Sequence, residues 1–158
     1  MKYKLILLLA FLVALSSCAK PERHEVPWED LKGTQWKLYE IRRNYGHSDD
    51  RIIKLEPQDC ENCYTLTFDE EKTGYATGVS IENTVDIQVL LGSEIPETGL
   101  SMVKVSVTEL DEPFDGNQYC DFMRSVTIIF STGFQLELYV FDDDNRINYL
   151  LIFERINP

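Results

Sequence analysis

Two cysteines that lie three residues apart are the first part of the chain whose spacing suggests chemistry. The segment Cys60-Glu61-Asn62-Cys63 has the C-x-x-C pattern of thiol–disulfide oxidoreductases, in which the motif opens a helix and the helix lowers a thiol pKa. Here the motif is followed by the alternating residues 64–68, which are typical of a β-strand. Because the helical context is missing, we do not expect a redox catalyst.

The same cysteines have two other uses, a metal site and a structural disulfide. A structural zinc site takes about four ligands, and besides this pair the chain offers only Cys120, His24 and His47. We therefore predict no metal site. A disulfide suits an oxidising compartment. The pairing Cys60–Cys63 is slightly favoured, and a bond from Cys120 to either of them is the alternative that stays open.

Acidic residues are the other candidates for chemistry. The segment 142–145, Asp-Asp-Asp-Asn, has the oxygen ligands that Ca²⁺ prefers, but it lacks the glycine and distal glutamate of an EF-hand loop, so a solvated hairpin turn is expected. Paired carboxylates of a glycosidase type remain an alternative, because the sequence does not reveal which acids lie together. The chain has no G-x-S-x-G, Walker or dinucleotide motif. We predict no catalytic residue, no cofactor and no enzyme.

The charge balance excludes one class of partner. The 158 residues include 27 Asp and Glu against 15 Lys and Arg, for a formal net charge of -12. Nucleic-acid binders need a basic surface to neutralise phosphates, so no nucleic-acid partner is expected. An acidic domain is also repelled by anionic lipid head groups and should stand away from a membrane surface.

The N-terminus has the layout of an export signal. Lys2 and Lys4 precede an apolar stretch at 5–15, which is too short to span a bilayer comfortably. Small residues and Cys18 follow, and this ending resembles a bacterial lipobox. In lipoproteins that show it, the signal is removed before the cysteine and the cysteine is lipidated. We therefore predict a signal peptide at 1–17 and lipidation of Cys18, which would anchor the chain to a membrane.

The remainder divides into a tether and one domain. Residues 18–27 contain two prolines and little apolar surface to bury, so they are predicted to link the anchor to the fold. Residues 28–158 have the length of a single domain. The expected location is the bacterial cell envelope, on the periplasmic or the surface face of the outer membrane.

Alternation of apolar and polar residues dominates this domain and predicts β-strands. Helix signals are limited to one turn near 28–31 and a second helix over 117–124 with Asn117 as its cap. Short connections between antiparallel strands favour a meander that closes into a barrel of about eight strands. The fold class is therefore all-β with one or two short helices. The expected strands are 34–42, 64–70, 74–80, 83–91, 100–109, 126–131, 134–141 and 146–155.

Several phrases resemble known proteins. Leu31-Lys32-Gly33-Thr34-Gln35-Trp36-Lys37-Leu38 is similar to the opening L-x-G-x-x-W-x-L of lipocalin-like and META (HslJ-like) domains. The segment 56–69 and the closing strands 136–139 and 149–153 resemble a group of small Bacteroidetes lipoproteins. The resemblance implies a compact, lipocalin-like barrel in the cell envelope, and it implies no catalytic residue.

Four aromatic residues are candidates for binding. Trp36 follows Gly33 at the expected start of a strand, where a core position at one end of the barrel is favoured over a ligand contact. Tyr39, Tyr139 and Phe141 fall on the outward parity of their strands and are expected to be exposed. The predicted function is non-enzymatic binding of a protein partner or a small ligand by a lipid-anchored domain. The alternative is an envelope hydrolase or a carbohydrate-processing accessory that uses paired carboxylates.

Overall fold

The computed structural model describes residues 27–57, 59–93 and 100–156. The predicted signal peptide, Cys18 and nearly all of the tether lie outside these residues. The described part contains a 3-10 helix, an α-helix and nine strands: η1 (Trp28–Leu31), β1 (Gln35–Arg43), β2 (Arg51–Ile53), β3 (Thr65–Phe68), β4 (Tyr75–Val79), β5 (Thr84–Val89), β6 (Ser101–Val107), α2 (Phe114–Ser125), β7 (Ile128–Ser131), β8 (Gln135–Phe141) and β9 (Ile147–Arg155).

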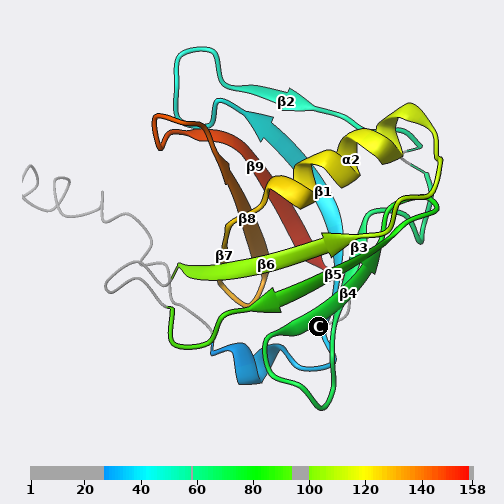
Figure 1. Cartoon of the computed structure of the whole chain (residues 1–158), viewed down its shortest axis with the longest axis vertical. Coiled ribbons are helices and arrows are strands. Elements are labelled where there is room, and N and C mark those ends of the chain that lie inside the picture. Colours follow the sequence, from blue (N-terminus) through cyan, green and yellow to red (C-terminus); the bar gives the residue numbers. More distant parts are fainter. Residues whose placement is uncertain (1–26, 58, 94–99, 157–158) are drawn as a thin grey trace, which may run out of the picture.

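All strand pairs are antiparallel, and the sheet closes on itself. Strands β3 to β9 follow one another in sequence order, β1 pairs with β3, and β9 returns to β1 with Leu38 opposite Phe153. Strand β2 is an extra strand whose one pairing among the described residues is with β1. The prediction of an all-β, eight-stranded meander barrel is confirmed (Figure 1).

Each of the eight expected strands is present, and the ninth, β2, was not predicted. Its three residues are too few to show a period of two, so the sequence carries no strand signal there. The helix α2 is longer than expected and begins at Phe114 after Pro113, because a helix start needs no N–H from proline. Asn117 is therefore not the cap. It lies inside α2, and its side-chain amide donates to the carbonyl of Glu112.

Side chains fill the barrel interior. Trp36, Phe68, Leu136 and Phe153 from four strands are fully buried in one continuous core. Helix η1 lies at one end of the barrel and α2 runs across the other, as Figure 1 shows. Tyr119 of α2 belongs to the same buried core, and its hydroxyl has no hydrogen-bond partner among the described residues.

A second apolar cluster lies on the outer face of β7, β8 and β9. Phe130, Tyr139 and Leu150 are buried there, because these strands are apolar on both faces. The prediction that Tyr139 is exposed is wrong. Its ring stacks against Phe141 with centroids 6.2 Å apart, and its hydroxyl donates to the Glu137 carboxylate.

No helix among the described residues is long and apolar enough to cross a membrane.

Candidate functional site

The C-x-x-C segment forms a disulfide-closed loop. Cys60 and Cys63 are bonded to each other with their Cα atoms 5.4 Å apart, while Cys120 is a buried free thiol. The structure thus contains the local pairing and not the long-range alternative. The loop leads directly into β3, and its conformation places Tyr64 at φ 55°, a left-handed backbone that a bulky residue rarely adopts.

Lys37 of β1 holds this loop in place. Its ammonium group donates to the carbonyl oxygens of Cys60 and Cys63, each at 2.5 Å, and to that of Glu61 at 3.3 Å. Partial burial lowers the pKa of Lys37, and the nearby Glu61 carboxylate opposes that shift. The three carbonyls take up the donors of an ammonium group, which has three. The positive charge of Lys37 is therefore committed to the fold.

The barrel wall is interrupted beside β1. The first residues of this strand, Gln35 to Lys37, pair with β3, whereas Ile41 to Arg43 pair with β2 on the same side. Between them the described residues 54–57 and 59–64 lie outside the strands, and the amide of Leu38 donates to the carbonyl of Tyr64. The stretch around Tyr39 and Glu40 therefore faces a gap between two partner strands.

A β-bulge lies at the same place. The pairing of β1 with β9 shifts between Leu38 and Glu40, which makes Tyr39 the extra residue. A bulge leaves its extra residue outside the regular ladder and redirects its side chain. Tyr39 is 64% exposed as a result, although it lies in the middle of a strand.

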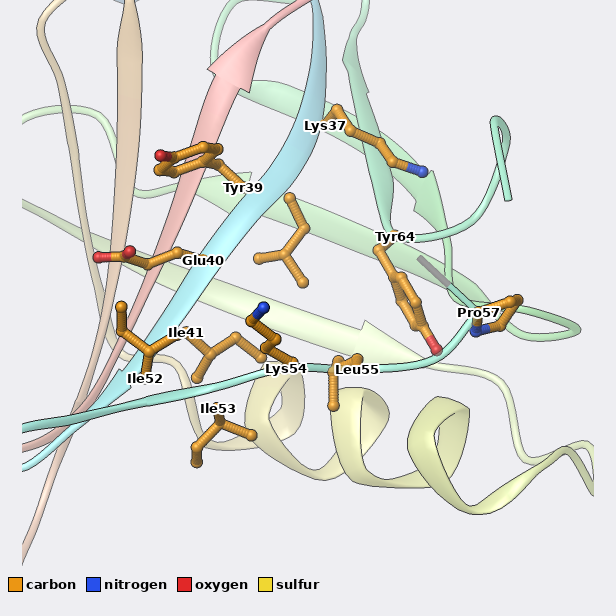
Figure 2. A pocket seen from close by; sticks show the side chains of 11 residues that line it. Lys37, Tyr39, Glu40, Ile41, Ile52, Ile53, Lys54, Leu55, Pro57 and Tyr64 are labelled. Carbon is orange, nitrogen blue, oxygen red and sulfur yellow. The ribbon is translucent and has the colours of Figure 1, made fainter. Parts of the chain in front are cut away.

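The gap forms a partly open pocket of about 430 Å³, shown in Figure 2. This volume is within the range of about 300–1,000 Å³ that is usual for small-molecule sites. Most of the surface that lines it is apolar or aromatic, with Lys37, Glu40 and Lys54 as the charged members. The uncharged lining residues are Leu38, Tyr39, Ile41, Ile52, Ile53, Leu55, Pro57 and Tyr64.

We call this cavity the wall pocket. Its rim at Glu56 and Tyr64 is held by hydrogen bonds to α2 and next to β3. The amide of Glu56 donates to the Asp115 carboxylate of α2 at 2.5 Å, and the Tyr64 hydroxyl donates to the Glu56 carbonyl at 2.6 Å. Burial, together with the nearby carboxylates of Asp115 and Glu112, raises the pKa of Tyr64 to about 12. The Tyr64 hydroxyl therefore stays protonated and keeps donating at physiological pH.

The two lysines of the wall pocket differ in their surroundings. Figure 2 shows the Lys37 side chain directed toward Tyr64 and Pro57, whereas the ammonium group of Lys54 points toward the middle of the pocket. Lys54 is exposed and makes no hydrogen bond or ion pair with any residue that the structure describes. Glu40 approaches Arg42 of the same strand at 3.7 Å, and in Figure 2 its carboxylate is directed away from Lys54.

A second polar cluster, at the α2 end of the barrel, is built on Glu112. Its carboxylate accepts from the Ser80 hydroxyl at 2.7 Å, the Ile81 and Glu82 amides at 3.0 and 2.9 Å, and the Asn83 side-chain amide at 2.6 Å. The Cys120 thiol is a further donor at 3.0 Å. We call this group of residues the Glu112 cluster.

The pKa values of Glu112 and Cys120 indicate that this cluster stabilises the fold. Burial by itself raises the pKa of Glu112, but the hydrogen bonds from Cys120, Glu82, Ser80 and Asn83 outweigh it and lower the pKa to about 2. Burial and the same carboxylate raise the pKa of Cys120 to about 11, which keeps it a thiol. A low-pKa thiol marks a reactive cysteine, so Cys120 has the opposite character.

The other predicted residues are placed as follows. Trp36 is fully buried, and its indole N–H donates to the Thr34 hydroxyl at 2.8 Å, so it belongs to the core. Phe141 is partly buried beside Tyr139 and does not reach the wall pocket. Asp142 accepts from the amides of Asp144 and Arg146 in the turn between β8 and β9, as expected of a hairpin turn. Of the four binding candidates, only Tyr39 lines the wall pocket.

Sequence reasoning missed the rest of the wall pocket. Ile52, Ile53 and Leu55 carried a weak signal, since apolar residues interrupt an otherwise polar connection between two predicted strands. Nothing local to Lys54 distinguishes it from other surface lysines. The described residues contain no group of three or more side chains that could hold a metal ion.

Comparisons with known proteins identify no relative. No protein-family model matches the chain, and no curated protein or solved structure matches it either.

Proposed function

We propose that this protein is a non-enzymatic, lipid-anchored binding domain of the bacterial cell envelope, and that it takes its ligand in the wall pocket. The wall pocket is the observation that supports this proposal most directly. It combines an apolar lining with an exposed aromatic residue on a bulge, and Tyr64 beside it holds a strained backbone. Strained residues and bulges are enriched at binding sites.

The filled interior favours one of two forms of the proposal. A lipocalin-like calyx would need space among Trp36, Leu66, Phe153 and their neighbours, which pack in one core. The wall pocket opens at the edge of that core, next to the gap between β2 and β3, where the core residues Ile41, Leu55 and Tyr64 line it. We therefore place the ligand at the side of the barrel and not in its lumen.

The pKa values of the carboxyl groups also favour a binding role over hydrolysis. A glycosidase-type acid needs a raised carboxyl pKa. In the described residues, the carboxyl groups with a resolved shift all have a lowered pKa: Glu29, Asp69, Glu112 and Asp142. The alternative of a hydrolase with paired carboxylates stays a prediction without a site.

Binding is tested with the full chain and a neutral apolar fluorophore, N-phenylnaphthylamine, whose emission rises in apolar surroundings. Ile52→Glu places a charge on the pocket wall at a side chain that is 55% exposed, so the fold should persist. We expect about a tenfold loss of affinity, the scale of one desolvated charge. Leu110→Glu, at a position that is 58% exposed and outside the pocket, is the matched control. Equal binding by both variants and the wild type would contradict the proposal.

The anchor is tested separately by cell fractionation. The full chain should sediment with membranes, and Cys18→Ser should release it, because the acyl chains supply the attachment. Membrane association that survives this substitution would overturn the anchoring part of the proposal.

A further inference from the structure

The geometry points to a single-chain amphiphile with a carboxylate head as the ligand of the wall pocket, its chain on the apolar lining and its head on Lys54. This inference rests on the proposed function and specifies the ligand class. It starts from the difference between two lysines that share one pocket.

Lys37 is not available to a ligand. Its ammonium donates to the carbonyls of Cys60, Cys63 and Glu61, and breaking those contacts would free the disulfide loop. Lys54 follows β2 directly, and no described residue contacts its ammonium through a hydrogen bond or an ion pair. An incoming anion would meet one uncommitted positive charge in the pocket, that of Lys54.

The rest of the lining suits an alkyl chain. Leu38 and Ile41 of β1 line the pocket together with Ile53 and Leu55, and the Tyr64 ring lies at the end near Pro57 (Figure 2). Its hydroxyl is already used on the Glu56 carbonyl, so that end offers the ligand an aromatic surface and no free donor. Apolar area therefore adjoins one charged group that has no partner among the described residues, that of Lys54, which is the complement of an amphiphile.

The sign of the charge follows from the neighbours. Glu40 is the acidic residue of the lining, and it lies 3.7 Å from Arg42, which is also bound to Asp50 at 2.8 Å. Two carboxylates thus share one guanidinium at the β1 side, and the Glu40 carboxylate is directed away from Lys54 (Figure 2), so the ammonium of Lys54 is the charge that a ligand head meets. A carboxylate on Lys54 gains an ion pair, whereas an ammonium head would be repelled.

The test uses the full chain and two photoreactive probes that differ only in the head group, a diazirine analogue of decanoic acid and the corresponding alcohol. Labelled peptides are mapped by mass spectrometry, so that only insertion at the pocket residues 38–41, 52–55, 57 and 64 is scored. We expect the acid to half-saturate this labelling at a concentration about three- to tenfold lower than the alcohol, the range for a partly exposed ion pair. Lys54→Gln should remove this preference without changing the alcohol, and Lys54→Arg should keep it.

Lys104→Gln is the matched control, because Lys104 is an exposed lysine on β6 outside the wall pocket. It should leave both probes unchanged. Pocket labelling by both probes with no preference for the acid would overturn this inference and leave the proposed function standing. Labelling of the pocket segments by neither probe would overturn both.

Discussion

The Glu112 cluster and the wall pocket are both polar sites on the same barrel, and they treat their charges in opposite ways. Five donor groups surround the Glu112 carboxylate, including the buried side chains of Ser80 and Asn83. In the wall pocket the ammonium of Lys54 meets no partner among the described residues. A charge that is fully hydrogen-bonded by its own chain serves the fold, while an unpaired charge beside apolar surface is available to a ligand.

The largest expected effect is on stability at the Glu112 cluster. Glu112→Ala removes the acceptor of the Ser80 hydroxyl, of one N–H of the Asn83 side-chain amide and of two backbone N–H groups, while the other Asn83 N–H keeps the Leu110 carbonyl. We expect the free energy of unfolding in urea to fall by about 2–4 kcal/mol, because unsatisfied buried donors are costly. Glu82→Ala, an exposed glutamate in the adjoining turn, should change it by less than about 0.5 kcal/mol. Similar losses in both variants would show that the cluster does not have this role.

The same cluster predicts a pH dependence. The pKa of Glu112 in the folded protein is about 2, below its ordinary 4.5. A carboxyl group with a lowered folded pKa stabilises the protein above its unfolded pKa, and this contribution disappears as the pH falls from about 4.5 to about 2. The wild type should therefore lose its advantage over Glu112→Ala between pH 5 and about pH 2, measured by urea midpoints. A difference that is constant with pH would contradict the assignment.

A smaller effect separates the two lysines of the wall pocket. Lys37→Met removes the donor that the loop carbonyls share, and we expect about 1–2 kcal/mol of lost stability. Lys54→Met removes no internal contact and should change stability by less than about 0.5 kcal/mol. Urea unfolding of both variants measures the contrast directly. If Lys54→Met proved as destabilising as Lys37→Met, Lys54 would have a structural partner and would not be free for a ligand.

The fold could be predicted from the sequence to a large extent. Strands such as β5 and β6 alternate strictly, since one face packs in the barrel and the other meets water, and this pattern is legible along the chain. Tyr139 shows that the alternation of residues along a strand predicts the direction of a side chain but not its burial. Its outward direction was predicted correctly, but its burial depends on Phe141, Leu150 and other residues of the outer cluster.

The candidate site was much less predictable, for a physical reason. The wall pocket depends on where β1 changes partner from β3 to β2 and on a bulge at Tyr39. Both are properties of pairing between distant segments, and neither leaves a local pattern. The sequence does not distinguish Lys37 from Lys54. Their neighbours in space do, because the ammonium of Lys37 binds loop carbonyls whereas that of Lys54 has no partner among the described residues.

The sequence by itself determined the strand pattern, the all-β class and the acidity, because each follows from local periodicity or from composition. It also supports the export signal and the lipidation of Cys18 as predictions. The tertiary structure decided that Cys60 bonds to Cys63, that Trp36 is core, that Glu112 collects its donors and that a pocket opens beside Tyr39. These outcomes depend on which distant residues the closing sheet brings together, and no window of the chain contains that information.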